Sequence, residues 1–253
     1  MNPFDLTGKV AIVTGGNGGI GFGIARGLAR AGAGVAIAAR NEAKTAAAVG
    51  TLEAEGARAL GVTVDVTREA SVNAMVATVV GRFGRLDILV NNAGINIRKP
   101  PEALTLEEWY RVIDTDLTSI FLCSRAAYPA FKKAGGGKIL NTGSLGALFA
   151  APYAAPYNAS KGGMVQLTKC LATAWAKDNI QVNAFHPGYT DTEFMRKARE
   201  EVPDMEAKVL SRSPMKRWGV PEDFAGLAVF LASPASSFVT GASIFIDGGY
   251  SCL

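Results

Sequence analysis

The chain has 253 residues, 49% of them hydrophobic and 19% charged, which excludes a disordered protein and allows a large buried core. Its formal net charge is +4, but the lysines and arginines are scattered and do not interleave with aromatic residues, so an anionic small ligand is favoured over nucleic acid. No apolar run approaches the length of about 20 residues that spans a membrane, and no signal peptide is expected.

Short aliphatic stretches recur along the chain, and each is continuous rather than alternating, as expected for parallel strands buried on both faces. The expected strands are residues 9–15, 34–40, 59–66, 86–94, 137–144, 180–188 and 242–249. Helical patterning covers residues 20–31, 42–56, 68–83, 105–133, 157–177 and 222–232. This alternation predicts one α/β domain over residues 1–253, with a doubly wound parallel sheet and helices on both faces.

A glycine-rich turn, TGGNGGIG, follows the first expected strand and opens a helix. Two sets of glycines satisfy the dinucleotide fingerprint, and the sequence does not choose between them. In either set the glycines allow close backbone approach, and the helix N-terminus offers free N–H groups to a pyrophosphate. The two sets are Gly16, Gly18 and Gly21, and Gly15, Gly19 and Gly21.

The end of the second strand indicates which dinucleotide is bound. An NAD site usually has Asp or Glu about 20 residues after the glycine-rich turn. Here Ala38 and Ala39 precede Arg40, whose guanidinium can bind a 2′-phosphate and stack on adenine. The sequence therefore favours NADP(H) over NAD(H), the alternative being that Arg40 is simply solvated. Asp65, after the third strand, can accept a hydrogen bond from the adenine amino group or cap the helix that starts near Thr67.

The sequence PYAAPYNASK contains two tyrosines and one lysine. Tyr157 and Lys161 are four residues apart in an expected helix and share one face, whereas Tyr153 has no cation at that spacing. The Lys161 ammonium and an oxidised nicotinamide would stabilise the Tyr157 phenolate, so Tyr157 is the expected general acid–base. Ser144 ends the fifth strand at the same edge of the sheet, and its hydroxyl can bond the substrate oxygen. The competing interpretation is a surface Tyr–Lys pair.

Residues 189–220 interrupt the strand–helix rhythm. They are charged, contain methionines and are too long for an ordinary connection. Because they follow a strand whose carboxyl end faces the ligand crevice, we predict a substrate lid at about 189–220; the alternative is a surface helical hairpin.

Together these motifs resemble the short-chain dehydrogenase/reductase family along essentially the whole chain. The resemblance implies a Rossmann fold with seven strands in the order 3-2-1-4-5-6-7, commonly assembled as a homotetramer. It also implies hydride transfer between a nicotinamide and a carbonyl or alcohol carbon. The stretches that carry it are TGGNGGIG at 14–21, DV at 65–66, NNAG at 91–94, Ser144, YNASK at 157–161, PGYTDT at 187–192 and IDGG at 246–249, which matches the last strand and a subunit interface.

The resemblance further implies the residues that contact the cofactor. Lys161 would bond the nicotinamide ribose, and the backbone of Thr190 would face the carboxamide. The full set of implied cofactor contacts is Gly15, Asn17, Gly19, Ile20, Gly21, Arg40, Asp65, Val66, Asn92, Ala93, Gly94, Tyr157, Lys161, Pro187, Gly188, Thr190 and Thr192.

One residue departs from the family's pattern. The helix after NNAG usually carries an asparagine, in a motif like VNLxxxF, that is thought to hold a water linking the lysine to solvent. Here the sequence is TDLTSIF, and Asp116 takes that place. An ionised aspartate only accepts hydrogen bonds, so it either keeps the water and stabilises charged Lys161 or loses a donor bond and slows proton exchange. We include Asp116 in the expected catalytic group and expect Asp116→Asn to retain or raise activity.

The substrate class is indicated by the segment INIRKPPE, which places basic Arg98 and Lys99 beside the expected substrate mouth. With KDNIQVNAFHPGYTDTEF and RSPMKRWGVPEDF, it resembles the sugar-acid branch of the family, such as gluconate 5-dehydrogenase and 2-deoxy-gluconate 3-dehydrogenase. A basic rim suits an anionic polyol or another small polar ketone. Alternatively, Arg98 and Lys99 are solvent-facing loop residues.

Two other functions stay open. Residues 145–156 are mostly small and apolar and would admit a hydrophobic ketone, so the alternative enzyme is a 3-oxoacyl-thioester reductase acting on an acyl carrier protein. The alternative of another class is a catalytically weak cofactor-binding sensor or scaffold, against which the intact Ser144, Tyr157 and Lys161 argue.

The sulfur and imidazole groups indicate no metal site. The cysteines, Cys123, Cys170 and Cys252, are odd in number and widely spaced, which suggests reduced thiols in a cytoplasmic protein. The single histidine, His186, is expected to be structural rather than catalytic.

Overall fold

The computed structural model describes residues 2–253, leaving aside the side chains of Lys197 and Glu201, and contains a seven-stranded sheet. Its strands are β1 (Val10–Thr14), β2 (Gly34–Ala39), β3 (Ala59–Thr63), β4 (Ile88–Asn91), β5 (Gly137–Thr142), β6 (Ile180–Pro187) and β7 (Ser243–Ile246). All neighbours are parallel, in the order β3-β2-β1-β4-β5-β6-β7. The predicted doubly wound Rossmann topology is confirmed.

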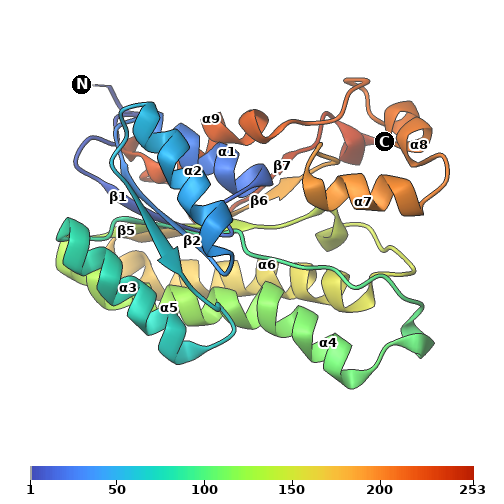
Figure 1. The fold of residues 1–253 in the computed structure, drawn as a ribbon, viewed down its shortest axis with the longest axis horizontal. Coiled ribbons are helices and arrows are strands. Elements are labelled where there is room, and N and C mark those ends of the chain that lie inside the picture. The colour runs from blue at the N-terminus through green and yellow to red at the C-terminus, as the bar shows by residue number, and fades with distance from the viewer. Residues whose placement is uncertain (1) are drawn as a thin grey trace.

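Helices cover both faces of this sheet. They are α1 (Gly19–Arg30), α2 (Glu42–Ala54), α3 (Glu69–Phe83), α4 (Leu106–Ile113), α5 (Ser119–Ala134), α6 (Ala155–Trp175), α7 (Glu193–Glu201), α8 (Met205–Arg212) and α9 (Ala225–Ala232). Figure 1 shows α1, α2 and α9 above the sheet and α3, α5 and α6 below it. Within residues 2–253, no helix combines the length and the apolarity that crossing a bilayer requires.

Two apolar cores fill the space between the sheet and its helices. Along β1, Val10 and Ile12 belong to the core beneath α3, α5 and α6, while Ala11 and Val13 belong to the core beneath α1, α2 and α9. Successive side chains of a strand point to opposite faces, so a strand covered on both faces is apolar at most of its positions. This explains why the strands read as continuous apolar runs.

The helix predicted over residues 105–133 is right in extent but wrong in continuity. Thr105 begins α4 by accepting a hydrogen bond from the Glu108 amide, while the Glu108 carboxylate accepts one from the Thr105 amide. The wider turn of a π-helix over Asp114–Thr118 then separates α4 from α5. An extra residue in a helical turn rotates the side chains that follow and often marks a functional site. Asp116 lies within this turn.

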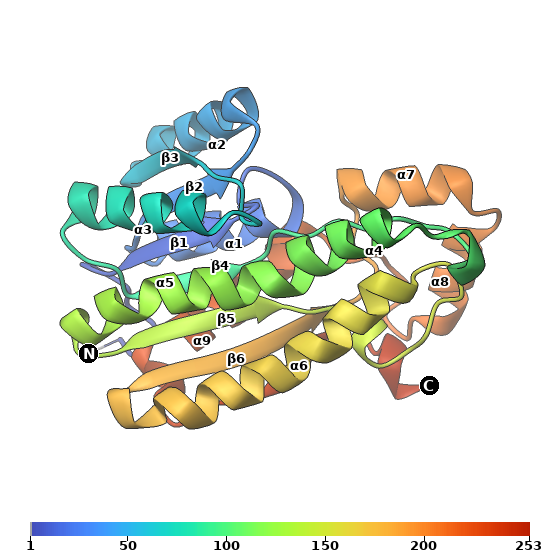
Figure 2. The ribbon, with the colours of Figure 1, turned by 90° about the horizontal axis from the view of Figure 1, so that it is seen from below.

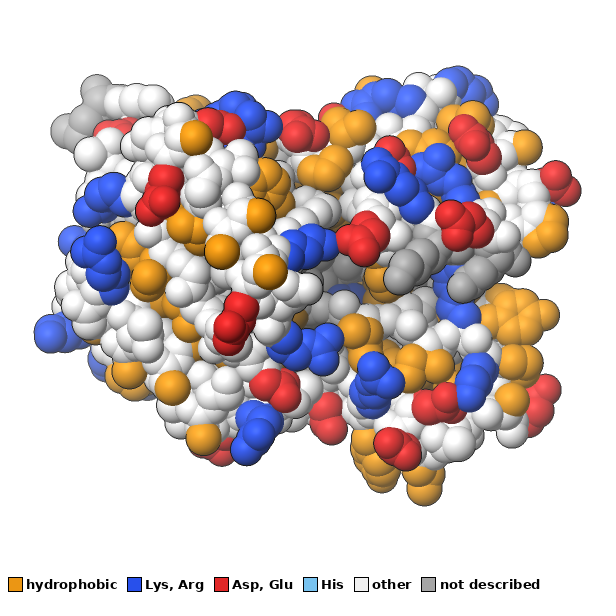
Figure 3. Space-filling model, in the orientation of Figure 1, with side chains coloured by type: hydrophobic (Ala, Val, Ile, Leu, Met, Phe, Trp, Pro, Cys, Tyr) orange, Lys and Arg blue, Asp and Glu red, His pale blue; other side chains and the backbone are white. Residues whose placement is uncertain are grey.

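The segment of residues 189–220, which follows β6, leaves the sheet. It forms α7 and α8, which lie beside the edge to which the β5 and β6 arrowheads point (Figures 1 and 2). Figure 3 shows a hollow between the part of the molecule that carries α7 and the part that carries α4, with Lys and Arg side chains on its rim. An ion pair of 2.7 Å between Lys44 Nζ on α2 and Glu193 Oε2 on α7 joins the two helices.

Candidate active site

Three glycines shape the turn between β1 and α1. Gly15 and Gly19 have positive φ angles of 62° and 50°, which side chains rarely adopt. A Cβ on Gly21 would lie 2.4 Å from both Asn92 Nδ2 and the Gly15 carbonyl oxygen. The structure therefore favours the set Gly15, Gly19 and Gly21. The turn ends at the α1 N-terminus, where free N–H groups suit a pyrophosphate.

Hydrogen bonds join this turn to the end of β4, where the strand order reverses. The Thr14 hydroxyl donates to the Val90 carbonyl at 3.2 Å and accepts from the amides of Asn92 (3.0 Å) and Ala93 (3.2 Å). The Asn92 side-chain amide donates to the carbonyls of Thr14 (3.1 Å) and Gly15 (3.2 Å). Asn92 thus fixes the floor of the turn. Sequence reasoning missed Thr14, although its position just before the glycines was a possible signal.

At the end of β2, Arg40 is exposed and follows the buried Ala38. Asp65 lies close enough to Arg40 for the two charges to interact. Asp65 Oδ1 accepts hydrogen bonds from the Thr67 hydroxyl (2.7 Å) and amide (3.0 Å), which lower the pKa of Asp65. The charges of Arg40 and Arg68 also lower this pKa, whereas burial raises it. Because α3 begins only after Arg68, Asp65 closes a turn rather than capping that helix.

Three further predicted contacts lie around these residues. Val66, next to Asp65, is buried in the core, and Ile20 packs against the core of the opposite face. The Asn17 side chain donates to the Thr45 hydroxyl at 3.1 Å and to the Asn41 carbonyl at 3.4 Å. Asn17 therefore ties the glycine-rich turn to the start of α2, beside Arg40.

Ser144, Tyr157 and Lys161 meet beyond the carboxyl end of β5. A Cβ on Gly146 would lie 3.4 Å from both Ser144 Oγ and Tyr157 Cε1, so these two side chains flank one point of the backbone. Lys161 Nζ lies 5.3 Å from the Tyr157 ring centroid and donates to the Thr142 carbonyl at 3.1 Å. Tyr157 is half-buried, whereas Tyr153 is 57% exposed. The structure therefore brings only Tyr157 to the lysine.

Asp116 is fully buried against Lys161. Its Oδ1 accepts a 2.8 Å hydrogen bond from the Ile95 amide, and its Oδ2 lies 3.3 Å from Lys161 Nζ with no hydrogen bond of good geometry. Burial raises the pKa of Asp116, opposed by Lys161 and the Ile95 amide. Burial lowers the pKa of Lys161, but Asp116 and Tyr157 raise it above its usual value. A Cβ on Gly94 would lie 2.8 Å from Asp116 Oδ2, so NNAG leaves room for the carboxylate.

His186 supports Ser144 from behind. Its Nδ1 lies 3.1 Å from the Ser144 carbonyl oxygen and 3.3 Å from the Ser144 amide nitrogen, and its ring stacks on Phe245 at 4.6 Å. Burial lowers the pKa of His186, with the Lys161 charge acting the same way against the Ser144 hydrogen bond. Neutral and 1% exposed, His186 is packed as a structural residue.

The loop after β6 lies against the glycine-rich turn. Pro187 ends β6, and a Cβ on Gly188 would lie 2.6 Å from the Asp247 Cα, so only glycine fits there. The Thr190 hydroxyl donates to the Gly188 carbonyl at 3.0 Å. Thr192 begins α7 and lies 3.3 Å from a Cβ placed on Gly19. The structure thus gathers the residues predicted for the nicotinamide end.

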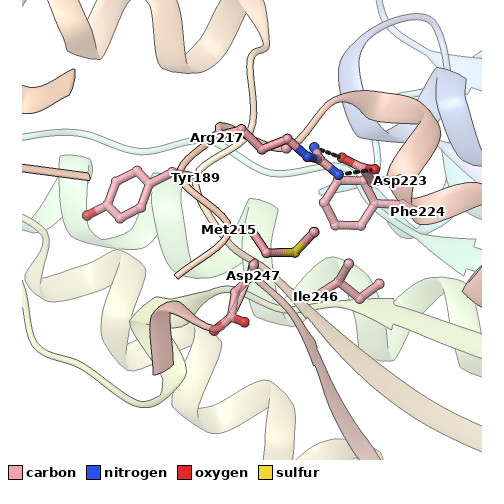
Figure 4. A pocket seen from close by; sticks show the side chains of 9 residues that line it. Tyr189, Met215, Arg217, Asp223, Phe224, Ile246 and Asp247 are labelled. Carbon is pink, nitrogen blue, oxygen red and sulfur yellow. Dashed lines mark hydrogen bonds and ion pairs between the residues drawn. The ribbon is translucent and has the colours of Figure 1, made fainter. Parts of the chain in front are cut away.

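The rim of the expected substrate mouth is less basic than the sequence suggests. Lys99 forms an ion pair with Glu108, so its charge is neutralised within the loop. Behind the loop after β6, a cavity of about 130 Å³ is lined by Tyr189, Met215, Arg217, Gly219, Asp223, Phe224, Ile246, Asp247 and Gly248. Figure 4 shows the Arg217–Asp223 ion pair at one end and the Tyr189 ring turned away from it. This cavity is too small for a dinucleotide.

The parallel sheet, the glycine-rich turn and the Ser–Tyr–Lys group define an oxidoreductase of the dinucleotide-binding class. Comparison with family models supports this: the model described as Enoyl-(Acyl carrier protein) reductase matches residues 15–251. The chain belongs to the short-chain dehydrogenase/reductase family.

Relatives of this chain include enzymes of sugar-acid metabolism. It is 41% identical to gluconate 5-dehydrogenase of Gluconobacter oxydans, over 97% of this chain and 96% of that protein. It is 39% identical to 5-keto-D-gluconate 5-reductase of Escherichia coli, with coverages of 97% and 96%. The crystal structure of a Burkholderia cenocepacia gluconate 5-dehydrogenase in complex with NADP and tartrate superposes with a TM-score of 0.94 at 39% identity, covering 100% of this chain and 98% of that one.

Proposed function

We propose that this protein interconverts a ketone and a secondary alcohol of a sugar acid with NADP(H), and that Tyr157 transfers the proton. The observation that carries the proposal is the meeting of Ser144, Tyr157 and Lys161 at the carboxyl edge of the sheet. The sugar-acid class is supported by relatives that are gluconate 5-dehydrogenases and 5-keto-D-gluconate 5-reductases over nearly the whole length of this chain.

In the proposed mechanism the nicotinamide supplies or accepts the hydride when the cofactor is bound. Ser144 Oγ donates a hydrogen bond to the substrate carbonyl and orients it. The Tyr157 hydroxyl gives its proton to the developing alkoxide in reduction, and the Tyr157 phenolate takes the proton of the alcohol in oxidation. Lys161, fixed by the Thr142 carbonyl and Asp116, stays charged and stabilises the Tyr157 phenolate. Asp116 thus acts through Lys161 and is a positioning residue.

The choice of NADP(H) rests on the end of β2. Arg40 is exposed there, and no carboxylate occupies the end of that strand. The related Burkholderia cenocepacia enzyme was crystallised with NADP. If Arg40 binds the 2′-phosphate, Arg40→Asp weakens NADPH binding by about 10- to 100-fold and leaves NADH binding equal or better, because it removes a charge-assisted contact and repels the phosphate. Fluorescence titration with both cofactors measures this. Arg68→Asp, nearby on the α3 side, is the control, and an unchanged NADPH preference in Arg40→Asp excludes the contact.

Three broader features belong to the same proposal. Residues 189–220 act as the substrate lid, supported by the ion pair that joins α7 to α2. The protein assembles as a homotetramer. Exposed apolar side chains support this assembly: Phe245 on the edge strand β7 is 38% exposed, and Leu106 on α4 and Phe121 on α5 are also exposed. The exposed thiols of Cys170 and Cys252 suit a cytoplasmic location.

A panel of ketones tests the reaction. NADPH oxidation is measured with 5-keto-D-gluconate, an acetoacetyl thioester and an aryl ketone, each also with NADH. Fast turnover of 5-keto-D-gluconate is expected. Preference for the thioester supports the 3-oxoacyl-thioester reductase instead, an alternative favoured by the 54% exposure of Leu148 in the loop before α6. Cofactor binding without turnover across the panel points to a sensor.

A further inference from the structure

The guanidinium of Arg212, at the end of α8, contacts two aromatic rings that lie edge to face, at 74° to each other. Its Cζ lies 4.5 Å from the ring centroid of Phe149 and 4.6 Å from that of Tyr250. Phe149 belongs to the loop that leads from Ser144 to α6, and Tyr250 follows β7. Three distant parts of the chain thus converge on one guanidinium beside the loop that carries Ser144.

These two ring contacts leave most of the N–H donors of the guanidinium without a hydrogen-bond acceptor. In the part of the chain that the structure describes, the Arg212 side chain makes one hydrogen bond, a 2.9 Å donation from Nη2 to the Leu253 carbonyl oxygen, and no ion pair. The nearby Asp247 carboxylate accepts instead from the amides of Gly249 (3.0 Å) and Ser251 (2.8 Å). Ring contacts do not consume the N–H donors of an arginine, and the planar edge of a guanidinium fits a carboxylate in a bidentate manner.

Phenol groups line the same place. The rings of Tyr189 and Tyr250 lie 5.1 Å apart. Burial, and then the electrostatic and hydrogen-bond interaction with Tyr250, raise the pKa of Tyr189 to about 12, while the charges of Arg98 and Arg212 act to lower it. Tyr189 therefore stays a neutral hydroxyl beside Arg212. A planar cation with neutral hydroxyls around it matches a molecule that carries both a carboxylate and alcohol groups.

We propose that Arg212, held in place by contacts with the Phe149 and Tyr250 rings, binds the carboxylate of the sugar acid and so determines specificity for acids over neutral polyols. This rests on the proposed function. The alternative basic residue of the rim, Lys99, is already paired with Glu108. Arg212 also lies within the segment predicted as a lid, at the end of α8, so its contact with Phe149 holds that segment against the loop of Ser144.

Equilibrium binding tests the assignment without turnover. The dissociation constants of gluconate and sorbitol are measured in the presence of NADPH. Sorbitol is the neutral counterpart of gluconate, with CH₂OH in place of the carboxylate. Neither ligand can accept the hydride of NADPH, so no turnover occurs during the measurement. Arg212→Ala and Arg212→Lys are compared with Arg196→Ala. This control removes the same charge from α7, where Arg196 is paired with Asp191 and exposed.

Arg212→Ala is expected to raise the gluconate dissociation constant by about 10- to 100-fold and to leave that of sorbitol within about twofold, the effect of losing a charge-assisted pair. Arg212→Lys keeps the charge but loses the planar fork and falls between. Arg196→Ala changes neither constant. Unchanged NADPH binding and thermal unfolding show that the variants are intact.

Two results overturn the assignment of Arg212 but not the proposed function. In the first, the wild type oxidises gluconate, but Arg212→Ala leaves the gluconate dissociation constant unchanged. In the second, Arg212→Ala raises the dissociation constants of gluconate and sorbitol equally. A wild type that turns over acyl thioesters or neutral ketones but neither binds nor oxidises gluconate overturns the proposed function as well. The two failures are therefore distinguished by the wild-type measurement.

Discussion

The two edges of the sheet each bury a lysine and an aspartate, but they arrange them differently. At the amino edge, Lys138 at the start of β5 donates to the Ser236 hydroxyl at 3.1 Å, and burial, followed by the charge of Lys9, lowers its pKa to about 8. At the carboxyl edge, Lys161 is more deeply buried, yet Asp116 and Tyr157 raise its pKa. Burial acts on both lysines in one direction, and only the neighbouring carboxylate and phenol reverse it.

The aspartates differ in the same way. Asp87 at the amino edge accepts from Arg85 through both oxygens, at 2.6 and 2.8 Å, and from the Val10 amide at 3.0 Å, with Lys9 at 3.4 Å. Asp116 at the carboxyl edge has one amide donor and one ammonium at ion-pair distance. A fully bonded carboxylate stabilises the fold, whereas an incompletely bonded one leaves its lysine available to a tyrosine and a ligand.

The largest effect is expected at the carboxyl edge. Tyr157→Phe should reduce kcat by about 10²- to 10⁴-fold, because it removes the proposed general acid–base and little else. Steady-state kinetics measures the loss, and thermal unfolding should be unchanged. Tyr153→Phe, on the exposed neighbouring tyrosine, is the matched control. Normal turnover in Tyr157→Phe would refute the proposed mechanism.

The opposite result is expected at the amino edge. Asp87→Ala should lower the free energy of unfolding by about 2–3 kcal/mol, because the Val10 amide, Arg85 and Lys9 lose their acceptor. Activity per folded molecule should stay at the wild-type value. Urea denaturation, monitored by circular dichroism, measures the free energy of unfolding. Kinetics at saturating cofactor measure the activity per folded molecule. A specific loss of activity would remove the contrast between the edges.

Asp116→Asn sharpens the comparison. Turnover at pH 7 should be retained or raised, while the alkaline limb of the kcat/KM profile moves to lower pH. The reason is that Asp116 offsets the burial that lowers the pKa of Lys161, and asparagine lacks this charge. Asp114→Asn, in the same π-helical turn, should leave the limb in place. A large loss of turnover at pH 7 would instead show that Asp116 has a role of its own.

The smallest effect concerns Lys138. An unfolded lysine has a pKa of about 10.4, so between pH 8 and that value the unfolded chain holds more protons than the folded one, and the free energy of unfolding rises with pH. Lys138→Met should abolish this slope and stabilise the protein at pH 7 by at most about 1 kcal/mol, because the site is partly solvated. Denaturation curves at several pH values measure it. An identical slope in the variant would show that Lys138 is solvated as an ordinary lysine.

Much of the site could be predicted because its residues are close in sequence or follow strands. The spacing of Tyr157 and Lys161 places them on one helix face, and the strand ends bring the glycine-rich turn, Asn92 and Ser144 to one edge of a parallel sheet. The glycine set could not be chosen from letters alone, because the φ angles of Gly15 and Gly19 and the space around Gly21 depend on Asn92.

By itself, the sequence determined the order of strands and helices and the residues at the carboxyl edge, since apolar periodicity and helical spacing are local properties of the chain. Only the tertiary structure decided which charges meet there. The π-helical turn brings Asp116 to Lys161, Glu108 neutralises Lys99, and Phe149 and Tyr250 enclose Arg212. These contacts join residues far apart in the chain, and their electrostatic effect depends on burial and distance, which sequence patterns do not specify.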